Sequence, residues 1–253
     1  MPESGLKTKE QIGEAASVDL AAFPALPWRL AGAEVMQVTF EVDLEATLAL
    51  LPEQLTRPVP PHARVIVARY PESPVGPYSE ALLLLAARFN MLPKNYVVAA
   101  VVTSEAARDA YAGIWSLPVS VGRVELRREH AAGGGEDITA TIAAGGPLAG
   151  IHLPGAYAVE PGMIRYDPLL SVRVPGGDEA EVFQFSGAPT IHEARLAKGA
   201  SVTCLTDAWG DPWFRLRSLN MISATFAVAD LELTEPAVQE ARGPGAGMSG
   251  GLP

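Results

Sequence analysis

The chain has 253 residues, of which 48% are hydrophobic, and 29 acidic against 19 basic residues give it a formal charge of −10. A chain of this size and apolarity can bury one large core, while its negative charge would repel the phosphates of a nucleic acid or an anionic lipid surface. We therefore expect neither a nucleic-acid nor a membrane partner. The single cysteine excludes an internal disulfide, and the polar N-terminus lacks the apolar core of a signal peptide, so we expect a cytoplasmic protein.

The two ends of the chain differ in composition from the body. Residues 1–20 mix charged and small side chains, and residues 242–253 form a Gly-rich tail. Neither segment offers enough apolar surface to offset the entropy lost on ordering. We expect a mobile N-terminal segment, a single domain over residues 21–241, and a disordered tail.

Strand patterns dominate the body. Apolar and polar residues first alternate over 36–43, which is typical of a half-buried strand, and the wholly apolar run 81–87 indicates a strand buried on both faces. The strands that we predict cover residues 36–43, 63–70, 78–89, 95–103, 121–129, 137–143, 170–174, 181–186, 200–206 and 221–234.

Helices are predicted at only two places. Asp43 is a suitable N-cap for residues 44–51, and Ser104 for residues 105–114. Residues 133–135 are three glycines between two strands and indicate a hairpin loop. Many strands with few helices favour a mainly β (α+β) fold, a barrel or a sandwich with short helices at its rim.

The residues that usually carry chemistry are sparse. Four scattered histidines and one cysteine show no metal-ligand spacing, and the chain has neither a G-x-S-x-G motif nor a Gly-rich phosphate loop. We therefore expect no metal and no cofactor. Lysine occurs only four times, twice within the first nine residues.

One carboxylate stands out by its surroundings. Glu80 begins the most apolar strand, and on that strand its side chain would point the same way as Tyr78 and Leu82. A carboxylate in such a place is either hydrogen-bonded and structural, or desolvated, with a raised pKa, and available for proton transfer. The sequence leaves both interpretations open.

Several short motifs follow one another in an order found in a known family. They are Pro27-Trp-Arg-Leu30, the segment 41–55, Val75-Gly-Pro-Tyr-Ser-Glu80, the segment 103–107, Trp115-Ser-Leu-Pro118 and Asp211-Pro-Trp-Phe214. Together the chain resembles the acetoacetate decarboxylase-like superfamily from about residue 27 to residue 240. The resemblance implies a curved, mostly antiparallel β-barrel around a central pocket, and often a homo-oligomer.

The resemblance also draws attention to what is missing after Pro118. In members that decarboxylate acetoacetate, this proline is followed by two adjacent lysines, one of which forms a Schiff base while the other lowers its pKa. Here those positions are Val119 and Ser120. The same alignment places Ala33 and Val65 where the family has a pocket arginine and a pocket acid, so the resemblance implies a more apolar pocket, suited to a hydrophobic ligand.

Three functions remain open. The first is a Schiff-base-free cyclase, isomerase or dehydratase, a lyase or isomerase of natural-product biosynthesis that acts on a hydrophobic, polyketide-like intermediate. Glu80 would be its general acid or base, Tyr78 or Ser120 would donate a hydrogen bond to a carbonyl, and Leu82 and Trp115 would contact the substrate. The second is a β-keto acid decarboxylase with its Schiff-base lysine relocated to Lys94. The third is a non-catalytic binder of an apolar ligand.

Overall fold

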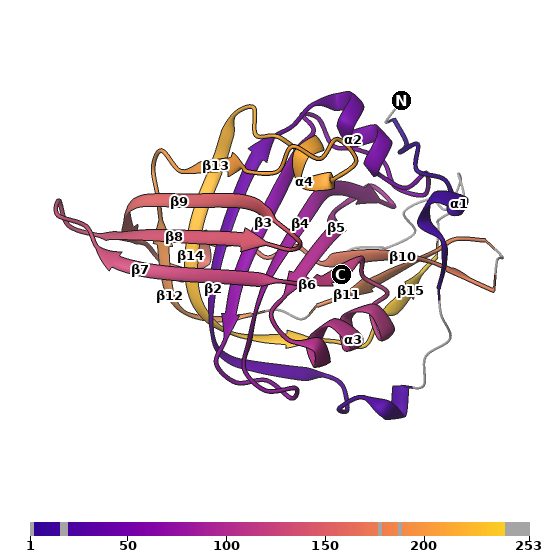
Figure 1. Cartoon of the computed structure of the whole chain (residues 1–253), viewed down its shortest axis with the longest axis horizontal. Helices are drawn as coiled ribbons and strands as arrows, with labels where there is room; N and C mark the ends of the chain where they lie inside the picture. Colours follow the sequence, from indigo (N-terminus) through magenta and orange to yellow (C-terminus); the bar gives the residue numbers. More distant parts are fainter. Residues whose placement is uncertain (1–2, 16–19, 177–178, 187–188, 241–253) are drawn as a thin grey trace, which may run out of the picture.

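The computed structural model describes residues 3–15, 20–176, 179–186 and 189–240 (Figure 1). The fold is mainly β, as predicted. Its strands are β1 (Glu14–Ala15), β2 (Trp28–Glu41), β3 (His62–Tyr70), β4 (Tyr78–Phe89), β5 (Leu92–Val102), β6 (Val119–Val121), β7 (Arg123–His130), β8 (Glu136–Ala143), β9 (Pro147–Ala158), β10 (Leu169–Pro175), β11 (Glu181–Phe185), β12 (Thr190–Leu196), β13 (Ser201–Cys204), β14 (Met221–Leu233) and β15 (Ala237–Gln239).

The helices are short and lie at the periphery. They are α1 (Lys9–Ile12), α2 (Leu44–Leu50), α3 (Glu105–Gly113) and α4 (Pro212–Arg215), with 3-10 turns η1 (Leu20–Ala22) and η2 (Pro161–Met163). Both predicted caps are confirmed: the Asp43 side chain accepts from the backbone N–H of Ala46 and the Ser104 side chain from that of Ala107. These bonds satisfy N–H groups that the first helical turn leaves unpaired.

The strands form one large curved sheet with open edges. Hydrogen-bonded neighbours follow the order β15-β11-β10-β5-β4-β3-β2-β14-β12-β9-β8-β7, and most pairs are antiparallel. In the described part of the chain the end strands β15 and β7 do not pair with each other, but the short strand β6, which leads into β7, pairs with β5 in parallel. The strands β7, β8 and β9 cross over the middle strands, where β7 contacts β3, β4 and β5, so the curved, mostly antiparallel sheet that we expected is present (Figure 1).

Two apolar clusters cover the two faces of the middle strands β2 to β5. The larger one, which includes Val38, Val65 and Leu83, packs these strands against β8 and β9. The other, which includes Ile66, Leu82 and residues of α3, covers the opposite face. The apolar strand β4 is buried on both faces, as predicted, because successive side chains alternate between the two clusters.

Two longer strands, β9 and β12, were missed by the sequence analysis, together with the short strands β1 and β15 and most of β6. β9 contains two prolines and two glycines, and β12 is largely polar, so neither shows a clear alternation. In β9 the backbone bulges near Gly155, which has a φ of +54° and whose N–H donates to Asp137 at 2.7 Å. Tertiary pairing with β8, β12 and β13 stabilises this strand where its own pattern does not.

Residues 3–15 of the N-terminal segment pack against the domain, with β1 pairing β10 in parallel. Its backbone forms hydrogen bonds with the end of α2 and with the turn that follows. The Gly5 N–H donates to the Leu55 carbonyl at 2.9 Å, and the Lys7 N–H donates to the Leu51 carbonyl at 3.0 Å. Gly5 permits this approach, since a Cβ there would lie 1.9 Å from the Leu51 carbonyl oxygen. The predicted tail 242–253 lies outside the described residues.

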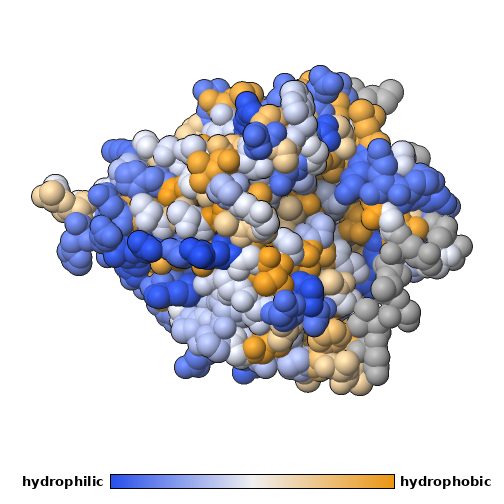
Figure 2. Space-filling view, in the orientation of Figure 1, coloured by the Kyte–Doolittle hydropathy of each residue, from blue (hydrophilic) through white to orange (hydrophobic). Residues whose placement is uncertain are grey.

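On the face seen in Figure 2, polar side chains predominate over the projecting β7–β8 hairpin, and apolar ones are scattered in small groups. Among the helices described, none is both long enough and apolar enough to pass through a membrane.

Candidate functional site

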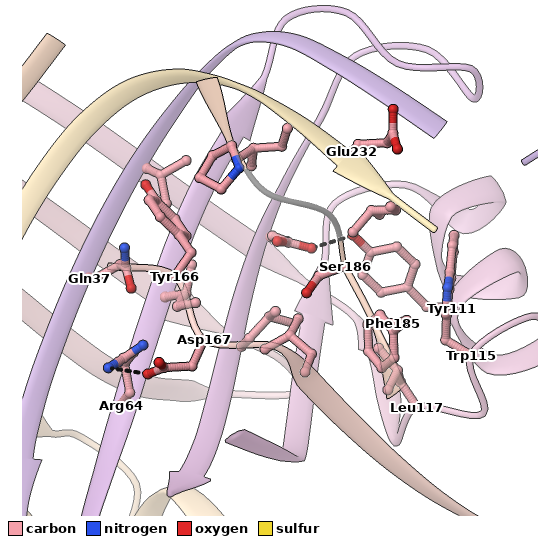
Figure 3. A pocket seen from close by; sticks show the side chains of 18 of the residues that line it. Gln37, Arg64, Tyr111, Trp115, Leu117, Tyr166, Asp167, Phe185, Ser186 and Glu232 are labelled. Atoms are coloured by element: carbon pink, nitrogen blue, oxygen red, sulfur yellow. Dashed lines mark hydrogen bonds and ion pairs between the residues drawn. The ribbon is translucent and has the colours of Figure 1, made fainter. Parts of the chain in front are cut away.

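A pocket opens on the face of the middle strands that α3 covers. Its cavity volume is about 60 Å³. Strands β2 to β4 form its floor, and its walls come from α3 and the loop after it, from the start of β10 and the end of β11, and from the end of β14 (Figure 3). The lining residues are mostly apolar or aromatic: Val35, Ile66, Leu82, Trp115, Leu117, Leu169, Phe185, Leu231 and Leu233, with Tyr70, Tyr111 and Tyr166.

Glu80 lies at the centre of a hydrogen-bonded group of tyrosines. Its side chain is only 3% exposed, and it accepts from the Tyr70 hydroxyl at 2.5 Å on Oε1 and from the Tyr111 hydroxyl at 2.5 Å on Oε2. Tyr78 and Tyr111 are joined through their hydroxyls at 2.9 Å. Since Tyr111 donates to Glu80, Tyr78 donates to Tyr111, and both oxygens of the buried carboxylate have a phenol donor.

The surroundings of Glu80 favour its neutral form. Burial raises the pKa of Glu80, and the hydrogen bonds from Tyr111 and Tyr70 oppose that rise without cancelling it. Burial and the nearby Glu80 carboxylate also raise the pKa values of Tyr70 and Tyr111, so both phenols stay protonated as donors. The arrangement provides a carboxyl group that can exchange a proton nearer to neutral pH than an exposed glutamate can.

A second polar group lies on the other side of the pocket (Figure 3). Arg64 pairs with Asp167 at 3.3 Å and donates from Nε to Thr39 at 3.1 Å. Near them are Gln37, whose side chain is 4% exposed, and Tyr166, whose pKa burial raises to about 12. Neither Gln37 Nε2 nor Tyr166 Oη makes a well-formed hydrogen bond with a described residue, although the Gln37 amide lies close enough to oppose the rise in the Tyr166 pKa.

Some of the residues predicted from the sequence line this pocket together. Glu80, Leu82 and Trp115 do so, and Trp115 is held by a bond from its indole N–H to the Thr234 carbonyl at 2.9 Å. Tyr78 does not reach the cavity. It lies behind Tyr111, in edge contact with that ring at 6.2 Å.

Four predicted contact residues lie elsewhere. Val65 packs in the apolar cluster on the opposite face, because its neighbours Arg64 and Ile66 alternate with it and point into the pocket. Ala33 is fully buried near the pocket but does not line it. Val119 is half-buried against the pocket's apolar cluster, and Ser120 is exposed; both border a separate open groove beside α4.

Lys94 also lies outside the pocket lining. Its Nζ donates to Gln184 Oε1 at 2.5 Å, and the Asp167 carboxylate partly offsets the lowering of the Lys94 pKa by burial. No lysine occurs among the described residues that line the pocket.

The residues that the sequence analysis missed are those that tertiary structure brings to Glu80. Tyr70 ends β3 directly opposite Tyr78 in the register, and Tyr111 comes from α3, some thirty residues further along the chain. Gln37 alternates as a polar residue in β2 and would have been predicted to face solvent. Its burial depends on the cover that the segment around Tyr166 provides, and β2 alone gives no indication of that cover.

The described residues contain no group of three or more His, Cys, Asp or Glu side chains placed to hold a metal ion. The polar atoms of the pocket are those of a carboxyl group, phenols, an amide, a hydroxyl and one ion pair, with Glu232 at the rim.

Comparisons with known proteins identify the family. Residues 15–242 match the family model described as acetoacetate decarboxylase, so the chain belongs to the acetoacetate decarboxylase family. An acetoacetate decarboxylase of Streptomyces nogalater is 32% identical over 110 residues, a match that covers 43% of this chain and 45% of that relative. The matched segment thus spans less than half of the length of this curated relative.

Solved structures share the fold across most of the chain. An acetoacetate decarboxylase superposes with a TM-score of 0.77 at 19% identity, covering 91% of this chain and 97% of that one. The enduracididine biosynthesis enzyme MppR, solved with pyruvate, gives a TM-score of 0.74 at 17% identity, covering 89% of this chain and 98% of that one. The fold is therefore shared by a decarboxylase and by an enzyme of a biosynthetic pathway.

Proposed function

We propose that this chain is an acid–base enzyme of the acetoacetate decarboxylase fold that works without a Schiff base, and that it isomerises, cyclises or dehydrates an apolar biosynthetic intermediate. The observation that carries the proposal is Glu80: a carboxyl group 3% exposed, with a raised pKa, that lines an apolar pocket. Tyr70 and Tyr111 fix its two oxygens and leave it aimed at the cavity.

The first chemical step would be transfer of a proton from carbon to Glu80. The carboxylate takes a proton from a carbon acidified by a carbonyl, and the electron pair of the C–H bond moves into the conjugated system to form an enolate. Return of the proton to a different carbon completes an isomerisation. Attack of the enolate on a second carbonyl closes a ring, and the alkoxide that forms takes the proton back from Glu80. Loss of a β-hydroxyl as water, after it receives the proton, completes a dehydration. Each route balances without an oxidant or a reductant.

The missing amine supports this proposal over decarboxylation. A Schiff-base mechanism needs a lysine that touches the bound ketone, and the positions of the family's lysine pair carry Val119 and Ser120. Lys94, the relocated candidate, is bonded to Gln184 outside the lining. The biosynthetic context of MppR shows only that this fold supports other roles, and the substrate class here rests on the pocket itself.

The size of the pocket limits the reacting part of the substrate. About 60 Å³ admits a compact group of a few heavy atoms. A longer polyketide-like chain would therefore have to extend past the rim near Glu232, with only its reactive end beside Glu80.

Proton exchange tests the proposal before the natural substrate is known. The wild type is incubated in D₂O with small neutral ketones and unsaturated lactones, and deuterium uptake at the acidic carbons is followed by NMR. We expect catalysed exchange that Glu80→Gln lowers by about 10²- to 10⁴-fold, the usual contribution of a positioned general base. Exchange that survives Glu80→Gln would contradict the proposal.

A matched control distinguishes the loss of the Glu80 carboxyl group from the general effect of removing a negative charge. Glu72 is an exposed glutamate in the loop before β4, and Glu72→Gln should leave exchange unchanged. Acetoacetate is assayed in parallel, since its decarboxylation would favour a relocated lysine. Binding of the ketones without any exchange would favour the non-catalytic binder.

A further inference from the structure

The polar side of the pocket holds two buried donors that lack a good partner. Gln37 is 4% exposed, and neither its Nε2 nor Tyr166 Oη makes a well-formed hydrogen bond with a described residue. Buried polar groups nearly always bond to protein, water or a ligand. Since both residues line the pocket, a hydrogen-bond acceptor inside it could satisfy both donors.

The charges around the pocket are already balanced, apart from that of Glu80. Arg64 pairs with Asp167 at 3.3 Å, and at the rim Glu232 lies 4.0 Å from Arg29. Among the described residues, the hydrogen-bond partners of the Glu80 carboxyl group are the neutral phenols of Tyr70 and Tyr111. Lys94 is engaged by Gln184 outside the lining.

An anionic ligand would therefore meet no unpaired cation among the described lining residues, and it would face the carboxylate of Glu80. Burying a charge without a partner is unfavourable in an apolar site. An uncharged acceptor incurs no such cost, and it can still take hydrogen bonds from Gln37 and Tyr166.

We infer that the pocket selects uncharged carbonyl compounds, such as ketones, esters or lactones, whose oxygen is held by Gln37 and Tyr166, and that it excludes carboxylates of the same shape. The inference rests on the proposed function only in naming this ligand as the substrate. Gln37 lies opposite Ile66, and Ile66 opposite Leu82, two residues along β4 from Glu80. Strand spacing then separates the Cα atoms of Gln37 and Glu80 by about 12 Å, so a ligand that reaches both extends over several bonds.

Two isosteric probes test this selectivity. Mesityl oxide is a neutral unsaturated ketone, and β,β-dimethylacrylate has the same skeleton with a carboxylate oxygen in place of the ketone's methyl group. Binding of each is titrated by ligand-observed NMR at pH 8. We expect the ketone to bind at least tenfold more tightly than the carboxylate. Equal or tighter binding of the carboxylate, or no binding of the ketone, would overturn the inference.

Variants assign the selectivity to the named residues. Gln37→Leu and Tyr166→Phe should each weaken binding of the ketone by about five- to tenfold, because each removes one hydrogen-bond donor. Glu80→Gln should strengthen binding of the carboxylate, because it removes the charge that the carboxylate would face. If both donor variants keep their melting temperature and bind the ketone as the wild type does, the assignment is wrong.

The two proposals fail in different experiments. If the ketone binds no more tightly than the carboxylate, the selectivity is refuted, whatever the rates of proton exchange are. Absence of Glu80-dependent exchange refutes the proposed chemistry and leaves the selectivity standing.

Discussion

Replacing Glu80 by glutamine should stabilise the protein increasingly as the pH rises. The folded state holds the Glu80 proton more tightly than the unfolded chain does, because burial raises its pKa above the ordinary value of 4.5. Between pH 4.5 and the folded-state pKa, the folded wild type thus binds more protons than the unfolded chain, and its free energy of unfolding falls as the pH rises. Above the folded-state pKa the loss is complete and stays constant.

The size of this change in stability follows from the titration of a single group. The slope of stability against pH is at most about 1.4 kcal/mol per pH unit for a single group. The substituted amide does not titrate, and it can keep the network by accepting from Tyr70 and donating to Tyr111, which then donates to Tyr78. Relative to the wild type, the free energy of unfolding of Glu80→Gln should therefore rise by up to about 1.4 kcal/mol per pH unit above pH 4.5. The difference should become constant above the folded-state pKa of Glu80.

The assay is urea unfolding of both proteins at half-unit steps from pH 5 to pH 9. For a domain of this length, 1 kcal/mol corresponds to about 2–4 °C in melting temperature, so thermal melts give a second readout. Glu72→Gln, at an exposed glutamate in the loop before β4, controls for removal of a surface charge. A stability difference for Glu80→Gln that stays flat, or that shrinks as the pH rises, would refute the reasoning.

Three further predictions test other parts of the structure. Tyr111→Phe removes a donor to the ionised Glu80 carboxylate, so the acid limb of the pH–rate profile for proton exchange should move up by about one to two pH units; an unmoved limb would mean that the bond does not tune the site. Treatment with acetone and borohydride, which would reduce a lysine Schiff base to a stable adduct, should give no added mass by mass spectrometry. Lys94→Met should retain full exchange activity. An adduct that forms in the wild type and disappears in this variant would establish Lys94 as the relocated Schiff-base lysine. Gly122→Ala should lower the melting temperature by several degrees, because its Cβ would lie 2.2 Å from the Ala143 carbonyl oxygen, whereas Gly133→Ala, with open space at that position, should change it little. Equal melting temperatures would contradict the close approach of the Ala143 backbone to Gly122.

The sequence by itself determined most of the strands and both longer helices. Alternation over β2 and the apolar run of β4 are local properties, and Asp43 and Ser104 bond backbone groups only three residues away. These features could be predicted because the interactions that produce them lie within one element. Glu80 could be singled out for the same reason, as a carboxylate at the mouth of an apolar strand.

Only the tertiary structure decided what surrounds Glu80 and which predicted contacts reach the pocket. Tyr70 and Tyr111 come from two separate elements, and the pairing of β3 with β4 and the packing of α3 bring their hydroxyls to the carboxylate. A side chain on a strand changes face with each residue, and Val65 lies on the face opposite the pocket while its neighbours Arg64 and Ile66 line it. How β7 to β9 fold back over the middle strands was likewise beyond the sequence, because it depends on contacts between strands that lie far apart in the chain.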